Sequence, residues 1–165
     1  MDIAKLSDCY AVRALREPDA EAVLRFCKRN ELYYQYCGME PTLEQVRSDM
    51  TLLPEGVEPA RKHYVGFYDG ERLVAVLDFI EAYPDPQSAY IGFFMMNADL
   101  QGRGTGSAII EEVAGSFKSM GVKRLRLAIA RDNPQATHFW LKNGFEVVRE
   151  ADMGGWTVLV ADRWL

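Results

Sequence analysis

The alternation of apolar and polar residues divides the chain into short segments of two kinds. Period-two alternation and short apolar runs predict strands at residues 10–16, 63–68, 73–82, 88–96, 124–130, 145–149 and 156–162. Helical spacing and helix-start signals predict helices at residues 19–30, 42–54, 107–121 and 133–143. The order is β-α-α-β-β-β-α-β-α-β-β, with antiparallel hairpins on both sides of one strand–loop–helix–strand crossover. We therefore expect an α/β fold with a mixed sheet and helices on both faces.

Turn and capping residues set several of these boundaries. Asp19 has the side chain of a helix N-cap, and Thr42 with Gln45 three residues later forms a capping box. Asp69-Gly70 is the signal of a tight hairpin. Pro134 occupies the first position of its helix, where proline is favoured.

Length and composition favour one domain. The 165 residues are 48% hydrophobic, enough for one core and one domain over residues 1–165. The formal net charge of −5 lacks the basic surface of a nucleic-acid-binding protein, so no nucleic-acid partner is expected. The longest apolar run, Ala89 to Met96, is far shorter than the roughly 20 residues that span a bilayer. Because the first residues also lack the pattern of a secretory signal, we expect a cytoplasmic protein with no membrane partner.

Cysteine and histidine are too few for a disulfide framework or a metal centre. Cys9, Cys27 and Cys37 are odd in number and form no Cys-x-x-Cys motif, which favours reduced thiols over a single bridge between two of them. His63 and His138 are the only histidines and lie far apart along the chain, so no metal is expected.

One loop carries the clearest chemical signal. The sequence Gln101-Gly-Arg-Gly-Thr-Gly106 lies between an apolar strand and a helix that begins at Ser107. Alternating glycines allow backbone N–H groups to converge, and a helix N-terminus adds free donors and a positive dipole. These features suit a pyrophosphate; the alternative is a glycine-rich helix start with no ligand.

Two other phosphate-binding patterns do not fit this loop. The chain contains no GxxxxGK[ST] run. A GxGxxG dinucleotide fingerprint read from Gly102 ends at Ser107, and one read from Gly104 ends at Ile109. A nicotinamide-dependent oxidoreductase is therefore the weaker alternative.

The loop and a second segment together resemble the GNAT superfamily of N-acetyltransferases. The loop is similar to its Q/R-x-x-G-x-G/A signature. Residues 133–145, which read Asn-Pro-Gln-Ala-Thr-His-Phe-Trp-Leu-Lys-Asn-Gly-Phe, are similar to its N-x-x-A-x-x-F-Y-x-x-x-G-F segment. One strand separates the two segments, and the inferred element order covers essentially the whole chain. The resemblance implies a GNAT-like fold with a central, mostly antiparallel twisted sheet, and an acyltransferase that uses acetyl-CoA and no metal.

The resemblance also assigns residues to acetyl-CoA. In the preceding strand, which carries a bulge and splays from its neighbour in this family, the Phe94 N–H would polarise the acetyl carbonyl and Met96 would bind the pantetheine arm. The other side of the arm would contact Asn133, Phe139 and Trp140. The loop and the start of its helix would hold the pyrophosphate, through Gln101, Gly102, Arg103, Gly104, Thr105, Gly106 and Ser107.

The proton-transfer groups match the family less closely. The Tyr that protonates the leaving thiolate is replaced by Trp140, whose indole N–H is a poor acid. Several members place a Glu or His four residues before the position of Phe94, where this chain has Tyr90. A four-residue turn between the two strands would set Tyr90 opposite Glu81, whereas a slip of one residue would bring Asp78 to that face. The candidate catalytic residues are therefore Tyr90, Glu81 and Asp78.

The acceptor is not specified by any motif. Tyr33, Tyr34 and Tyr36 fall where the family covers its acceptor site and would form an aromatic wall there, with ordinary packing as the alternative. We expect direct transfer to a primary amine of a small molecule or peptide, without a covalent enzyme intermediate. An alternative of another class is a domain that binds acyl-CoA as a sensor without turnover. For the oligomeric state we expect a homodimer, because two-fold dimers are the commonest oligomers.

Overall fold

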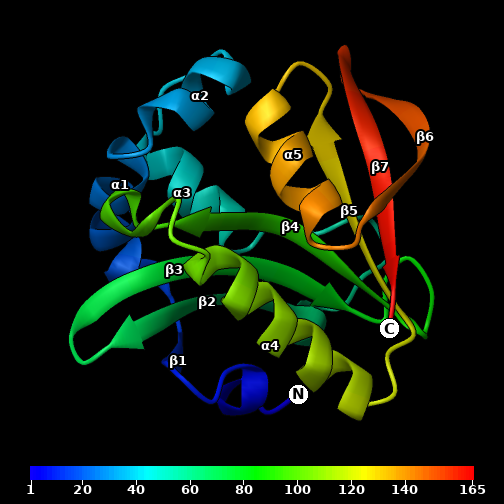
Figure 1. Cartoon of the computed structure of the whole chain (residues 1–165). Helices are drawn as coiled ribbons and strands as arrows, with labels where there is room; N and C mark the ends of the chain where they lie inside the picture. The colour runs from blue at the N-terminus through cyan, green and yellow to red at the C-terminus, as the bar shows by residue number, and fades with distance from the viewer.

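The computed structural model describes all 165 residues and is built around one seven-stranded sheet (Figure 1). The strand order is β1-β2-β3-β4-β5-β7-β6, and every neighbouring pair is antiparallel except β4 and β5. The mixed, mostly antiparallel sheet predicted from the sequence is therefore confirmed. The strands are β1 (Ala11–Ala14), β2 (Lys62–Asp69), β3 (Arg72–Glu81), β4 (Ser88–Met96), β5 (Arg124–Ala130), β6 (Glu146–Met153) and β7 (Trp156–Trp164).

Helices cover both faces of the sheet. In Figure 1, α4 and α5 cross in front of it, and the three N-terminal helices gather on the far side of β4. None of the helices has the length and apolar character needed to span a membrane. The five α-helices are α1 (Ala20–Lys28), α2 (Glu31–Cys37), α3 (Leu43–Asp49), α4 (Thr105–Ser119) and α5 (Pro134–Lys142).

Each face has its own hydrophobic core. The larger core contains 22 buried residues and packs α4, through residues such as Ile109 and Phe117, against the sheet. The smaller core contains 10 buried residues and packs α1 and α3 against the opposite face, with Val23 and Val46 close to Val76 of β3. Successive residues of a strand point to opposite faces, so β2, β3 and β4 supply residues to both cores.

The helices differ from the sequence expectations in three places. Asp19 directly precedes α1, but its side chain accepts from the Arg16 N–H at 2.8 Å and does not cap the helix. The tyrosine-rich stretch after α1 forms an additional short helix, α2, which ends at Gly38 with a left-handed φ of +64°. In α3, Thr42 accepts a hydrogen bond from the Gln45 N–H, but the Gln45 amide donates to Asp49 at 2.6 Å and does not complete the capping box. The helix also ends at Asp49, five residues before Pro54.

The two parallel strands at the centre of the sheet are joined over only part of their length. Ser88–Ile91 of β4 pair with Arg124–Leu127 of β5, and the strands then diverge (Figure 1). Next to the divergence β4 carries a bulge, because Asp78 pairs with Phe93 and Phe79 pairs with Ile91. One extra residue, Gly92, is left unpaired between them.

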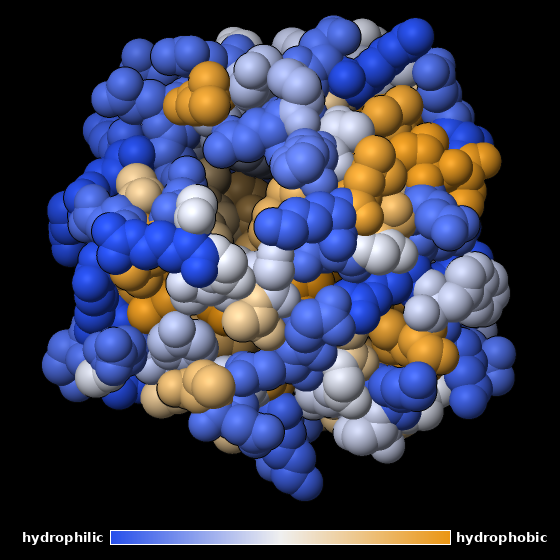
Figure 2. Space-filling model, in the orientation of Figure 1, coloured by the Kyte–Doolittle hydropathy of each residue, from blue (hydrophilic) through white to orange (hydrophobic).

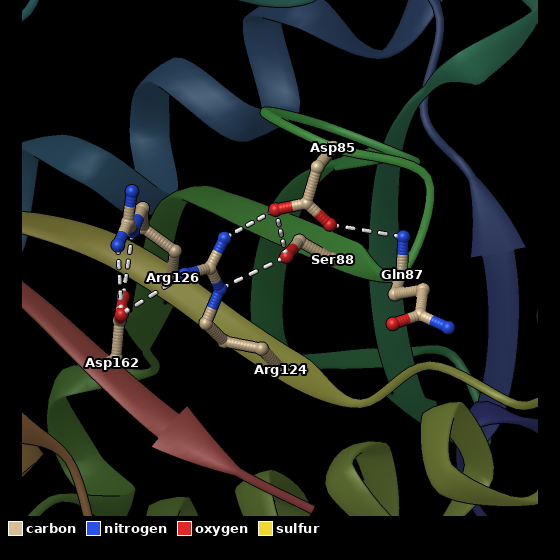
Figure 3. A network of polar contacts seen from close by, with 6 residues as sticks. All are labelled: Asp85, Gln87, Ser88, Arg124, Arg126 and Asp162. Carbon is tan, nitrogen blue, oxygen red and sulfur yellow. Dashed lines mark hydrogen bonds and ion pairs between the residues drawn. The ribbon is translucent and has the colours of Figure 1, made fainter.

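A polar network fixes the joined end of these strands (Figure 3). Arg124 donates to Ser88 Oγ at 2.9 Å and also pairs with Asp85 in the turn before β4. Arg126 forms a bidentate pair with Asp162 of β7 at 2.6 and 2.7 Å. Because the Asp162 side chain is only 5% exposed, these charge-assisted bonds hold β4, β5 and β7 together below the point of divergence.

Candidate functional site

A cleft of about 420 Å³ opens where β4 and β5 diverge, within the size range of about 300–1,000 Å³ of small-molecule sites. Its two walls are residues 91–96 of β4 and 127–130 of β5, and the rest comes from the loop before α4, from α5 and from α2. Figure 2 shows it as a hollow near the centre of the molecule, with apolar side chains inside a mostly hydrophilic rim. No Asp or Glu side chain lines the cleft.

The glycine loop presents free backbone donors to this cleft. Gly102 and Gly104 have left-handed φ values of +73° and +82°, which glycine adopts without a steric penalty, and Gly104 is the N-cap of α4. The N–H groups of residues 102–107 have no hydrogen-bond partner in the protein, since the first bond of α4 runs from Ala108 N–H to the Gly104 carbonyl. Gly102, Gly104, Gly106 and Ser107 line the cleft, whereas Arg103 and Thr105 do not. Free N–H groups at a helix N-terminus are an arrangement that suits a bound anion.

Gln101 supports the loop rather than extending into open space. Its Nε2 donates to Asn30 Oδ1 at 2.6 Å and to the Met96 carbonyl at 3.4 Å. Asn30 is itself buried and donates back to the Phe26 carbonyl of α1 at 3.1 Å. The loop is thereby tied both to β4 and to the end of α1.

An aromatic group separates the β4 wall from α5. The Phe94 ring stacks on Phe139 at 5.8 Å and lies 6.0 Å from Trp140. Trp140 is 8% exposed and packs edge-on against Phe145 at 5.0 Å, so its ring belongs partly to the core. Asn133 lines the cleft while its side chain caps α5 by accepting from the Ala136 N–H at 2.9 Å.

The start of α4 lies very close to the same wall. A Cβ at Gly106 would come within 3.1 Å of Met96 Cγ and within 3.3 Å of the Phe139 ring. Gly106 therefore allows the loop amides to approach the cleft wall formed by Met96 and α5.

Of the three tyrosines that were expected to line the acceptor site, only one reaches the cleft. Tyr33 lines it and packs edge-on against Phe93 of β4 at 5.8 Å. Tyr34 faces a separate hollow beside the end of α2, and Tyr36 lines neither space. The helical turn of α2 spreads these side chains around the helix, so the expected three-residue wall is reduced to Tyr33.

The register of β3 and β4 corrects one expectation about the catalytic candidates. Tyr90 pairs with Ile80, and Glu81 pairs with Ala89, so Tyr90 does not lie opposite Glu81. Ala82 has a φ of +50° and adds one residue on the β3 side of the turn, which produces the slip. Asp78 and Tyr90 consequently share the face covered by α1 and α3, and Glu81 lies on the other face.

The two carboxylates have different surroundings. Glu81 Oε1 lies 2.5 Å from Nε2 of His63, whose pKa is lowered by burial. Asp78 pairs with Lys62, whose Nζ lies 2.8 Å from each of its oxygens. Burial raises the pKa of Asp78 to about 6, against the lowering effect of Lys62. Neither carboxylate lines the cleft, but Asp78 Oδ2 lies directly against Gly92, which does.

Several lining residues were missed from the sequence. Gln135, His138 and Lys142 line the cleft from one face of α5, and their i, i+3, i+7 spacing was a signal available in the segment already assigned to the cofactor. Cys37 of α2 also lines the cleft, with its pKa raised by burial, and nothing in its sequence context marks it. No group of His, Cys, Asp and Glu side chains is arranged to hold a metal ion.

Three solved acetyltransferase structures are similar in fold to this chain. A crystal structure of an acetyltransferase from Thermus thermophilus is similar, with 29% identity and a TM-score of 0.76 over 93% of this chain and 96% of that one. An AAC(6')-Ib structure in complex with ribostamycin and coenzyme A has 15% identity and a TM-score of 0.73, over 95% and 94% of the two chains. The PaiA N-acetyltransferase of Thermoplasma acidophilum, in complex with coenzyme A, has 16% identity and a TM-score of 0.65, over 93% and 98%.

A comparison with curated proteins finds no match. The sequence model of the acetyltransferase (GNAT) family, however, matches residues 25–145. That segment includes α2, the divergent strands, the glycine loop and α5. The chain therefore belongs to the GNAT family of acetyltransferases.

Proposed function

We propose that the protein transfers the acetyl group of acetyl-CoA to a primary amine by direct attack within a ternary complex. The observation that carries the proposal is the row of unpaired N–H groups at residues 102–107, which opens onto the cleft between the diverging strands. Coenzyme A in the PaiA and AAC(6')-Ib structures and acetyl-CoA in a further AAC(6')-Ib complex support this choice of donor.

The residues fit the parts of acetyl-CoA as follows. The pyrophosphate would accept hydrogen bonds from the loop amides, including those of Arg103 and Thr105. The pantetheine arm would lie along the β4 wall, between Met96 and the α5 residues Phe139 and Trp140. The Phe94 N–H would donate to the acetyl carbonyl, where one oriented donor is worth about 3–4 kcal/mol in the transition state.

The proposed reaction begins with proton transfer. The acceptor arrives as an ammonium and gives one proton, through a water beside Gly92, to the Asp78 carboxylate behind the cleft wall. The neutral nitrogen then attacks the thioester carbon, and its lone pair forms the C–N bond while the carbonyl electrons move to oxygen. Collapse of this intermediate breaks the C–S bond, and the nitrogen loses a second proton. The products are the amide, coenzyme A as its thiol, and one proton released from Asp78.

Asp78 is the strongest of the three candidates for this base. Glu81 lies on the opposite face of the sheet beside His63. Tyr90 shares the face of Asp78, but burial raises its pKa from 10, so it stays protonated at neutral pH. Trp140 offers no acidic group to the leaving thiolate. The second proton of the nitrogen therefore reaches the sulfur through water.

Trp140 also favours one alternative function, a domain that binds acyl-CoA as a sensor without turnover. Calorimetric titration with acetyl-CoA, coenzyme A and NADH in parallel tests the donor. Micromolar binding of both CoA species with no NADH signal is expected, and silence from all three would overturn the proposal. A thiol-release assay over a panel of primary amines then separates the two functions. CoA binding with no thiol release for any amine, and no effect of Asp78→Asn on the thiol-release signal, would favour the sensor.

A further inference from the structure

We propose that Lys62 is a positioning residue for acetyl transfer, whose ammonium holds the Asp78 carboxylate ionised and directed at the cleft behind Gly92. The inference rests on the proposed function and adds to it a residue in β2 that lies outside both sequence motifs and outside the cleft lining.

The pair is deeply buried and closely fitted. Lys62 Nζ lies 2.8 Å from both oxygens of Asp78, and the two side chains are 7% and 10% exposed. Asp78 pairs across the strands with Tyr64, so Lys62 reaches it diagonally along the sheet from two residues away. A buried carboxylate is costly unless it is paired, and Lys62 is the cation that pairs with this one.

Gly92 makes this carboxylate relevant to the cleft. It is the unpaired residue of the β4 bulge, it is exposed, and it lines the cleft. A Cβ at this position would overlap Oδ2 of Asp78. The absence of a side chain therefore leaves only the Gly92 backbone beside the carboxylate, at the point where the two strands separate.

Three other ionisable groups lie near Asp78 on the elements packed against it. Tyr64 of β2 and Tyr90 of β4 stay neutral, because burial raises the pKa of each phenol. Asp49 of α3 acts on Asp78 as a like charge and raises its pKa. Lys62 is therefore the sole group that favours the ionised form.

The charges around Asp78 set the direction in which the pH profile moves. Asp78 has a pKa of about 6, raised by burial and lowered in part by Lys62. A base must be ionised to accept a proton, so activity falls as the pH drops through this value. Removing the Lys62 cation raises the pKa and moves the acidic limb to higher pH. Removing the Asp49 charge has the opposite effect.

The test is the pH profile of kcat/KM for the purified full chain with its best amine. Wild type is expected to lose activity below a pH near 6. Lys62→Met should move that limb upward by about one pH unit or more. Lys62→Arg should restore it, and the Kd for coenzyme A should stay within about twofold of wild type in both variants, since Lys62 does not line the cleft.

A limb that stays in place in Lys62→Met, or a loss of rate that is equal at every pH, would overturn the proposal. If Lys62→Met does not fold by circular dichroism, Lys62→Gln takes its place, because it also removes the cation and must move the limb upward; no movement in that variant overturns the proposal equally. If no amine is acetylated, a carbon NMR titration of the Asp78 carboxyl measures the same shift without turnover. Failure of the proposed function and failure of the Lys62 role are thus separate results.

Discussion

Asp78 Oδ2 occupies the space where a Cβ of Gly92 would stand. Gly92→Ala must therefore displace the carboxylate or distort the bulge, although it removes no functional group. We expect kcat to fall by at least about tenfold, because a misplaced general base loses part of a contribution of about 10²–10⁴. Gly115→Ala is the matched control, since Gly115 is exposed on α4 with nothing near its Cβ position. Steady-state kinetics decide, and unchanged turnover in Gly92→Ala would contradict the proton transfer across this residue.

Gly104 should be essential for binding of acetyl-CoA. Its left-handed φ of +82° orients the amides at the start of α4, and a β-branched side chain is strongly disfavoured there. Gly104→Val is expected to abolish measurable calorimetric binding. Gly121→Val controls for backbone strain, because Gly121 has a φ of +86° at the other end of the same helix. Equal weakening by both variants would show that strain alone is responsible.

The bond between Asn30 and Gln101 should act as one unit in holding the loop. Gln101→Ala is expected to weaken acetyl-CoA binding about fivefold, as one lost hydrogen bond of about 1 kcal/mol implies. Asn30→Ala removes the same bond from the other side, and the double variant Asn30→Ala, Gln101→Ala should be no weaker than Asn30→Ala alone. Additive losses in calorimetric Kd values would mean that the two side chains act separately.

The Arg126–Asp162 pair should be a major contributor to stability. Asp162→Ala leaves the Arg126 guanidinium without its partner and removes one of the three contacts of Arg124 at the joined end of β4 and β5. We expect the free energy of unfolding to fall by about 3 kcal/mol, as for other broken buried pairs. Glu150→Ala breaks the Arg131–Glu150 pair, whose side chains are each 54% exposed, and should cost less than about 1 kcal/mol. Urea denaturation measures both, and similar midpoints for the two variants would contradict this difference.

The sequence specified the parts of the fold whose signals are local. The bounds of β4 and β5 follow from apolar runs between turn residues, and both were predicted to the residue. The register between β3 and β4 was not predictable, because it depends on the positive φ of Ala82 and on the bulge at Gly92. A lone glycine inside a strand is itself a signal for a bulge or a close approach, and here it marks both.

The candidate site likewise contains residues that local sequence signals identify and residues that only the folded chain brings together. The glycine loop could be recognised because its chemistry lies in consecutive backbone groups. The side chain of Lys62 could not, because its pairing with Asp78 arises only when β2 and β3 pair and their common face is buried. The helical conformation of α2 was the missing information for the tyrosines, although Gly38 directly after them is a helix-ending signal.

The short parallel pairing of β4 and β5 affects the stability of the folded protein. Four residue pairs join the two halves of the sheet, so a molecule that bridges the cleft supplies contacts that the polypeptide itself does not make. Binding to the folded chain at 100 times the dissociation constant adds about 2.7 kcal/mol to the free energy of unfolding. For the proposed donor, the resistance of this protein to unfolding and proteolysis thus becomes tied to the metabolic supply of acetyl-CoA.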